Sequence, residues 1–252
     1  MIRTYAIGDI HGQIDRLKQA HDRIAADRAR VADADALVVH VGDLVDRGPD
    51  SAGVIDWLAR GIAAGRPWEV LLGNHDRMFL MFLDDPGVKD SRLRSHVTYV
   101  HPAIGGAETL ASYGVANPGD RPLGKVHADA IARVPEAHRR FLADRPLMHR
   151  RGEALFVHAG IQPGVPLAHQ VEDDVIWIRE PFLSHRGDHG FLVVHGHTAI
   201  DAPVHYGNRV NIDSRAGYGG PLSAVVVEGR DVFLLADDGR RPLTPDPDAP
   251  VR

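Results

Sequence analysis

The sequence lacks cysteine, long apolar runs and an excess of positive charge. With no cysteine among 252 residues, disulfides and thiolate metal sites are excluded, and a reducing compartment is compatible with the composition. No run reaches the ~18 apolar residues that a membrane helix needs, and the first residues do not have the layout of a signal peptide. We therefore expect a cytoplasmic protein without a membrane partner.

The charge balance is slightly acidic, whereas histidine is abundant. Twenty-nine Lys and Arg stand against 34 Asp and Glu, a net charge of −5. A general nucleic-acid binder would usually be basic, so no nucleic-acid partner is expected. There are 16 His but only 4 Met and 3 Trp. Because histidine ligates metals and transfers protons near neutral pH, its positions direct the search for a site.

Short apolar runs alternate with helical periods in the first third of the chain. Apolar runs at 4–7, 36–41 and 68–72 predict buried strands, and the apolar spacing at 14–24 and 51–64 predicts amphipathic helices. This alternation indicates an α/β fold. In such folds ligands bind beyond the C-terminal ends of the strands, where each of these runs stops at Gly-Asp or Gly-Asn.

The rest of the chain divides into three regions. Residues 84–150 have few strand signals and predict a helical insertion over the core, with helices near 106–113 and 127–143. Further strands are expected at 154–158 and 191–194, and an antiparallel sheet over 204–235. We expect a single domain over 1–236, followed by a disordered tail at 237–252 that is rich in Pro and Asp.

Five short clusters combine an apolar strand with a glycine and an Asp, Asn or His. They lie at 8–12 (GDIHG), 42–48 (GDLVDRG), 73–76 (GNHD), 157–160 (VHAG) and 195–198 (HGHT). Glycine allows a sharp turn as the backbone leaves the sheet. One such cluster is commonly only a turn, but five in this order indicate polar side chains that converge at one rim. Their oxygen and imidazole donors suit Mn, Fe, Zn or Mg.

These motifs resemble those of the calcineurin-like metallophosphoesterases, and specifically the bacterial and phage members of the phosphoprotein phosphatase family. They span residues 8–198, about three quarters of the chain, and 211–213 and 218–220 resemble the closing segment of that family. The resemblance implies a four-layer α/β (α+β) sandwich of two mixed β-sheets flanked by helices. It also implies a two-metal centre at the rim of the sheets.

The resemblance implies six metal ligands. Asp43 would bridge two divalent ions, Mn²⁺ first and Fe, Zn or Mg as alternatives. The full set is Asp9, His11 and Asp43 for the first ion and Asp43, Asn74, His158 and His197 for the second. Many relatives have a further His at the position of Ala199, so the first ion would keep a water here. His195 is not a ligand in this register, although a contact with the centre stays open.

The same resemblance implies how phosphorus would be attacked. Two cations ~3.5–4 Å apart would lower the pKa of a bridging water enough to supply hydroxide for in-line attack. His75 is the candidate acid for the leaving oxygen, and Asp46 would orient it. Arg47 would bind the phosphate, as would Arg179 by a shorter motif (WIRE, 177–180), for which a surface salt bridge is the alternative. Asp76 replaces the Glu of eukaryotic relatives, which leaves the position of His75 in doubt.

Three functions are compatible with this site. The main hypothesis is a phosphomonoesterase, specifically a serine/threonine or dual-specificity protein phosphatase acting on a phosphoprotein or a small phosphoester. The alternative is a symmetrical diadenosine tetraphosphate hydrolase. Such enzymes typically lack an acid where Asp46 stands, because an anhydride releases a phosphate that needs no proton, but an insertion at 84–150 could close over a larger ligand. A non-catalytic binding module is disfavoured because the ligands, His75, Asp46 and Arg47 are intact.

Overall fold

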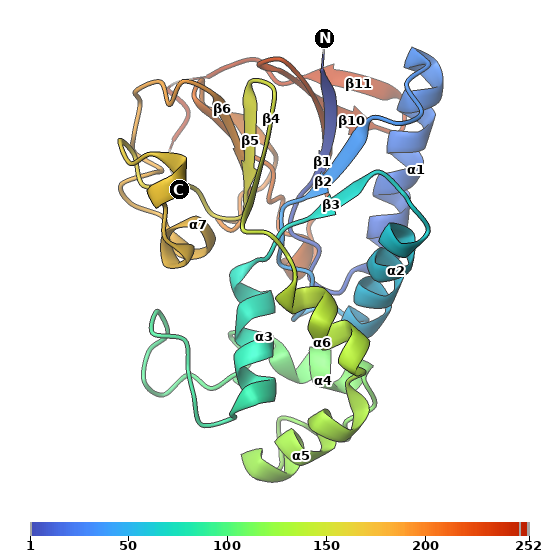
Figure 1. Ribbon diagram of the computed structural model, residues 1–252, viewed down its shortest axis with the longest axis vertical. Coiled ribbons are helices and arrows are strands. Elements are labelled where there is room, and N and C mark those ends of the chain that lie inside the picture. Colours follow the sequence, from blue (N-terminus) through green and yellow to red (C-terminus); the bar gives the residue numbers. More distant parts are fainter. Residues whose placement is uncertain (1, 247, 251–252) are drawn as a thin grey trace.

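Two β-sheets form the centre of the molecule. The computed structural model describes residues 2–246 and 248–250 (Figure 1). Sheet A has the strand order β11-β10-β9-β1-β2-β3, and sheet B the order β4-β5-β6-β8-β7. The strands of sheet A are β1 (Arg3–Ile7), β2 (Leu37–His40), β3 (Trp68–Val70), β9 (Ala224–Glu228), β10 (Asp231–Ala236) and β11 (Gly239–Pro242). Those of sheet B are β4 (Met148–Arg151), β5 (Ala154–Val157), β6 (Leu192–His195), β7 (Val204–His205) and β8 (Arg209–Asn211).

Both sheets are mixed, which confirms the predicted fold class. β1 pairs parallel with β2 and antiparallel with β9, while β5 pairs parallel with β6 and antiparallel with β4. The helices are α1 (Ile14–Val31), α2 (Ser51–Ala63), α3 (Asn74–Asp84), α4 (Gly106–Ser112), α5 (Leu123–Arg133), α6 (Glu136–Ala143) and α7 (Glu172–Trp177). No helix of the described residues is long and apolar enough to span a membrane.

Strand alternation explains the layers. In β1, Ala6 belongs to the apolar cluster between the two sheets, with Phe156 and Val194 of sheet B. Its neighbours Tyr5 and Ile7 belong to the cluster on the helical side of sheet A. Since successive side chains of a strand point to opposite faces, one apolar run supplies both cores. In Figure 1, α1 and α2 flank sheet A, and α7 lies on the other side, beside sheet B.

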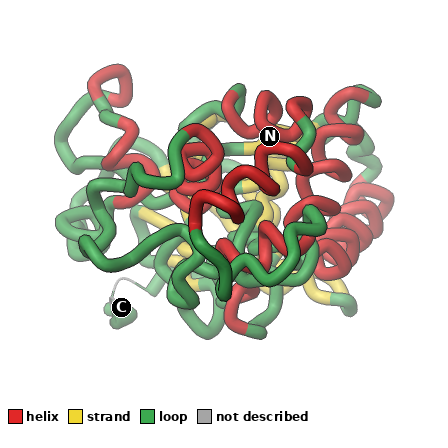
Figure 2. Tube along the Cα trace, turned by 90° about the horizontal axis from the view of Figure 1, so that it is seen from below, coloured by secondary structure: helices red, strands yellow, loops and turns green. Residues whose placement is uncertain are grey.

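The expected insertion contains helices α4, α5 and α6. They lie below the sheets in Figure 1, beside α3, and the view from below is dominated by helices and loops (Figure 2). The helical stretch expected at 127–143 is two helices, because Pro135 fixes the backbone and holds Val134 extended between α5 and α6. Residues 148–150 do not belong to a helical region: they are part of β4, which pairs with β5.

Part of the expected disordered tail is ordered. Residues 239–242 form β11, which pairs antiparallel with β10 at the edge of sheet A. The guanidinium of Arg240 reaches Asp27 on α1, at 2.7 Å, and Glu228 on β9, at 3.0 Å. These long-range ion pairs outweigh the Pro- and Asp-rich composition on which the prediction rested. Residues 247, 251 and 252 lie outside the described part.

Candidate metal centre

The polar clusters converge because each follows a strand that ends at the same rim. Asp9, Asp43 and Asn74 lie two to four residues beyond the ends of β1, β2 and β3 of sheet A, and His158 and His197 come after β5 and β6 of sheet B. With His11, these six predicted ligands are at most 8% exposed. We refer to Asp9, His11, Asp43, Asn74, His158 and His197 as the donor cluster. Burial of so many polar groups requires compensating partners.

One half of the donor cluster surrounds the side-chain oxygen of Asn74. This Oδ1 lies 2.9 Å from Nε2 of His158 and 2.8 Å from Nδ1 of His197. Nε2 of His158 also lies 3.3 Å from Oδ1 of Asp43. Ligand atoms of Asp43, His158 and His197 all lie within 4.8 Å of one another. Two oxygens and two imidazole nitrogens therefore face one point, a donor set that a divalent cation can accept.

The other half places carboxylates close together. Oδ2 of Asp43 lies 3.5 Å from Nε2 of His11, and Asp9 accepts a hydrogen bond of 3.0 Å from the backbone N–H of His197. Burial, followed by repulsion from Asp213 and Asp43, raises the pKa of Asp9 well above its ordinary value. Burial also raises the pKa of Asp213 to about 6. Such repulsion between buried acids is what a bound cation would relieve.

The imidazoles are suited to hold a cation. Burial lowers the pKa of His11, His158 and His197, so all three favour the neutral form that binds metals. The Nδ1–H of His11 donates to the carbonyl of Val45 at 2.8 Å, and that of His158 to the carbonyl of Val41 at 2.9 Å. These bonds fix the tautomer and leave Nε2 of both rings facing Asp43. The donor cluster therefore fits a divalent metal.

The loops that carry these residues are strained. Among the described residues, eight non-glycine residues have positive φ, and five of them belong to this site, with φ from 46° to 73°: His11, Asp43, Asp46, Arg47 and His197. Each left-handed residue costs of order 1 kcal/mol or more, so the surrounding bonds must hold it. Glycine is needed beside them, because a Cβ on Gly73 would lie 2.2 Å from the backbone nitrogen of Asp43.

Asp76 braces two of these loops. Its carboxylate accepts hydrogen bonds from the backbone N–H groups of Gly73 and Leu44, each at 2.9 Å, and of Val45 at 3.3 Å. Although it is shorter than the Glu of eukaryotic relatives, the Asp76 side chain therefore bridges the 42–48 and 73–76 loops. His75 stands beside the donor cluster, and its backbone N–H donates to Oδ1 of Asp43 at 2.9 Å.

His75 and Asp46 form the predicted pair. Nδ1 of His75 lies 2.7 Å from Oδ2 of Asp46, which is fully buried. The other oxygen of Asp46 accepts from the hydroxyl of Tyr99 at 2.6 Å and from that of Thr109 at 2.8 Å. Both hydroxyls come from the 84–150 region, and no local sequence signal marked them. Nε2 of His75 faces the guanidinium of Arg47 at 2.9 Å.

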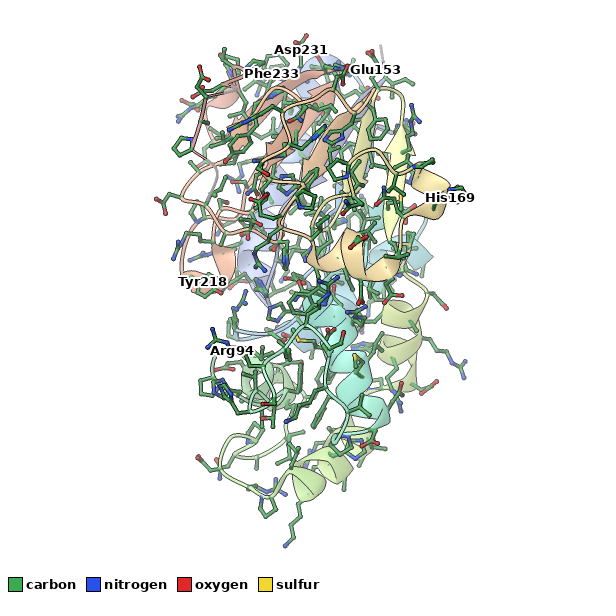
Figure 3. All side chains as sticks on the ribbon, turned by 90° about the vertical axis from the view of Figure 1, so that its left-hand side faces the viewer. Arg94, Glu153, His169, Tyr218, Asp231 and Phe233 are labelled. Atoms are coloured by element: carbon green, nitrogen blue, oxygen red, sulfur yellow. The ribbon has the colours of Figure 1, made fainter. Side chains whose placement is uncertain are left out.

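A pocket of about 190 Å³ opens on this cluster. Its lining includes Asp43, His75, Arg47, Arg179, Trp177 and Tyr218. Arg179 lines the pocket, and no carboxylate of the described residues pairs with it within 4 Å, so the surface salt bridge is not formed. The ring of Tyr218 lies 4.5 Å from the guanidinium of Arg47. Tyr218 stands at the level where the sheets meet the insertion (Figure 3).

Two further residues change the sequence-based description of the site. Asp213 lines the pocket and follows β8, so the same strand-then-acid pattern could have identified it. His195 is fully buried, but its Nδ1 faces the carbonyl of Gly196 at 3.0 Å and its Nε2 faces Arg209 at 3.2 Å. With both ring nitrogens engaged away from Asp43, His195 is not part of the donor cluster.

Comparison with known proteins gives the family. The model of the family described as calcineurin-like phosphoesterase matches residues 2–226. A curated relative from Dechloromonas aromatica, the bis(5'-nucleosyl)-tetraphosphatase, symmetrical, is 30% identical over 160 residues, which are 64% of this chain and 44% of the relative. A relative of the same name from Acidovorax sp. is 32% identical over 163 residues, which are 63% of this chain and 44% of the relative. This chain thus matches less than half of the length of these relatives.

Solved structures share the fold. The crystal structure of a candidate diadenosine tetraphosphatase superposes with a TM-score of 0.63 at 24% identity, over 95% of this chain and 93% of the other. A cold-active protein tyrosine phosphatase superposes with a TM-score of 0.63 at 19% identity, over 97% of this chain and 79% of the other. The curated relatives do not point to the phosphoprotein phosphatase branch that the motifs resemble.

Proposed function

The chain belongs to the calcineurin-like phosphoesterase family and is a phosphoester hydrolase, and from this premise we propose that its substrate is a dinucleoside tetraphosphate of the diadenosine type. The observation that carries the proposal is the match to symmetrical bis(5'-nucleosyl)-tetraphosphatases over 160 residues. Symmetrical cleavage breaks the central P–O–P bond, adds one water and releases two nucleoside diphosphates. The sequence motifs leave this hydrolase as the alternative to a protein phosphatase, and the curated relatives favour it.

The donor cluster would hold two ions. In this assignment Asp43 is shared, Asp9 and His11 complete one ligand set, and Asn74, His158 and His197 complete the other. When bound, the ions would supply a water of lowered pKa and neutralise charge on the phosphoryl oxygens. Mn²⁺ is the first choice, with Fe, Zn or Mg as alternatives, since carboxylate, amide and imidazole donors without sulfur suit all four.

Protein side chains would orient the phosphates of the substrate. The guanidiniums of Arg47 and Arg179 line the pocket, and their planar forks match pairs of phosphate oxygens. The imidazole of His75 would hydrogen-bond the leaving phosphate oxygen, which in an anhydride needs no proton. Asp46 holds Nδ1 of His75, and its contacts with Tyr99 and Thr109 keep that carboxylate in place.

The size of the pocket supports a substrate with a large part outside it. About 190 Å³ is less than the ~300–1,000 Å³ of sites that enclose whole small molecules. The pocket therefore suits the reacting phosphates, and the nucleosides would lie beyond it. Trp177 and Tyr218 lie at this boundary, and Tyr218 is 58% exposed, so an aromatic ring is free to contact a base.

One observation favours a second candidate, a phosphomonoester such as a phosphoprotein. The alkoxide released from a serine or threonine ester is a poor leaving group and needs an acid, and the His75–Asp46 pair is intact. The likeness to the protein tyrosine phosphatase shows the fold alone, so it adds nothing to this candidate.

A direct comparison of substrates tests the proposal. The purified chain is assayed with Mn²⁺ on diadenosine tetraphosphate, a phosphoserine peptide and p-nitrophenyl phosphate, and nucleotide products are separated by chromatography. We expect ADP as the nucleotide product and a kcat/KM for the dinucleotide at least about tenfold above that for the peptide. A preference for the peptide would favour the second candidate, and hydrolysis of none of the three would contradict both.

A further inference from the structure

We propose that a second pocket, on the helical side of sheet A, binds a free nucleoside phosphate. It lies between α1, α2 and the start of β3 and measures about 380 Å³, twice the pocket at the donor cluster. We refer to it as the tryptophan pocket, and its lining is His21, Asp22, Ala25, Arg28, Trp57, Arg60, Gly61, Ala64, Arg66 and Trp68. It shares no lining residue with the pocket at the donor cluster, and the inference does not depend on the proposed function.

One wall of the tryptophan pocket is aromatic and held in place. The rings of Trp57 and Trp68 are stacked with centroids 4.6 Å apart, and the imidazole of His21 lies 4.7 Å from the first and 4.6 Å from the second. Trp68 lies directly on the backbone of α2, since a Cβ on Gly61 would come within 1.8 Å of its ring. His21 is fixed by a bond of 2.9 Å to His40. Such a wall can stack on a flat base without reordering.

The rest of the lining is cationic. Arg28, Arg60 and Arg66 contribute three guanidiniums, against the carboxylates of Asp22 in the lining and of Asp56, which pairs with Arg60 at 3.0 Å. Arg66 is exposed and has no ion pair within 4 Å in the described part of the chain. An excess of guanidinium groups beside an aromatic wall suits an anionic group attached to a ring, because guanidinium binds phosphate oxygens in pairs.

Arg28 is anchored in the lining of the pocket. Its Nη2 donates to the carbonyl of Ala36, which anchors the side chain, whereas its Nε is buried and has no hydrogen-bond partner within the described residues. The guanidinium of Arg28 therefore adds positive charge to the lining, which favours an anionic ligand. Asp22 can accept hydrogen bonds from ribose hydroxyls. Base, sugar and phosphate would each meet matching chemistry.

Simpler ligands match the lining less well. Inorganic phosphate would make no use of the aromatic wall, and an uncharged aromatic ring would desolvate the guanidiniums without pairing them. A volume of about 380 Å³ falls within the ~300–1,000 Å³ typical of small-molecule sites. A mononucleotide is thus the class of ligand that uses both the aromatic wall and the charge.

Tryptophan fluorescence provides a test that needs no turnover. The sequence has three tryptophans, so the full-length Trp177→Phe variant reports on Trp57 and Trp68 alone. We expect ADP, titrated in the presence of EDTA, to quench this emission to saturation, and adenosine or phosphate to bind at least about tenfold more weakly. Adding Arg66→Ala should raise the Kd for ADP about tenfold. Arg133→Ala, an exposed arginine on α5 with the same change in charge, should leave it unchanged.

Three results would overturn the inference. The first is the absence of saturable quenching by ADP. The second is an unchanged Kd in the Arg66→Ala protein. The third is binding that is lost in Arg47→Ala but kept in Arg66→Ala, which would place ADP at the donor cluster. Since hydrolysis is not measured, failure here and failure of the proposed function are separate outcomes.

Discussion

The two sheets contribute different chemistry to the rim that they share. Sheet A supplies the oxygen donors Asp9, Asp43 and Asn74 and one imidazole, His11, whereas sheet B supplies the imidazoles of His158 and His197. The buried carboxylates of sheet A repel each other unless a cation lies between them, and the neutral imidazoles of sheet B add ligands for that cation. The site therefore exists only where the two sheets pack together.

Asp43 links the two contributions. Its Oδ2 lies 3.5 Å from His11, which follows β1 of sheet A, and its Oδ1 lies 3.3 Å from His158, which follows β5 of sheet B. Burial raises the pKa of Asp43, whereas the surrounding histidines, His158 first, lower it when they are protonated, and the net direction is below the ordinary range. Asp43 is thus an anion between the residues of sheet A and those of sheet B. We therefore expect its substitution to disturb the site more than any other.

The largest expected effect comes from removing that charge. Asp43→Asn keeps the shape but cannot serve two cations, so kcat should fall by at least about 10³-fold. The rate is measured on the best substrate, with metal content determined in parallel. Asp27→Asn is the control, because Asp27 is equally buried but pairs with Arg240 away from the rim. An Asp43→Asn enzyme of near normal rate would contradict the account.

The next largest effect is expected for a variant of sheet A that alters proton transfer but not metal binding. Asp46→Asn leaves the donor cluster intact but weakens the orientation of His75, so kcat should fall by about 10²–10⁴-fold on alkyl phosphates. The loss on p-nitrophenyl phosphate should be much smaller, because its phenolate leaves without a proton. Rates on both esters and metal content are measured. Equal losses on the two esters would remove Asp46 from the proton pathway.

A third pair of variants compares the two sheets directly. Asp9→Asn removes a donor of sheet A, and His158→Asn removes one of sheet B. Each should lower the affinity for one ion by at least about 10–100-fold, because losing even an outer partner of a metal ligand has an effect of that size. Competition with a chromophoric chelator measures both affinities. The account fails if either variant binds metal as tightly as the wild type.

The smallest effect concerns stability away from the rim. Burial lowers the pKa of His40, at the end of β2, from 6.5 to about 4. Between these values the unfolded chain binds a proton that the folded chain does not, so the free energy of unfolding falls as the pH drops through this range. The His40 contribution between pH 7 and pH 5 should be about 2 kcal/mol.

Urea unfolding at both pH values checks this. His40→Gln is compared with the wild type, which cancels the effect of the buried histidines that His40 does not contact. The variant should lose less stability on acidification than the wild type does. An identical pH dependence in the two proteins would show that His40 titrates normally.

Side chains that stand directly after strands are easier to predict from the sequence than contacts made across the fold. Asp9, Asp43 and His158 are predictable because each stands beside a glycine where an apolar run stops, and parallel strands end at one rim. Tyr99 and Thr109 are not, since they reach Asp46 from 53 and 63 residues away and no local pattern marks such contacts.

Tertiary contacts also account for the other differences. The edge strand β11 forms in a segment of disordered composition because Arg240 finds carboxylates on α1 and β9. The position of His75 was in doubt because Asp76 is shorter than Glu. The three backbone N–H groups that Asp76 binds could not be seen in a linear pattern.

Counting bound metal tests the central claim most directly. The wild-type chain, stripped with EDTA and dialysed against Mn²⁺, should hold two ions per molecule, with the electron paramagnetic resonance signal of a coupled pair. Asp43→Asn should hold fewer and show only isolated Mn²⁺. One uncoupled ion in the wild type, or two ions in the variant, would contradict a centre built on the shared carboxylate.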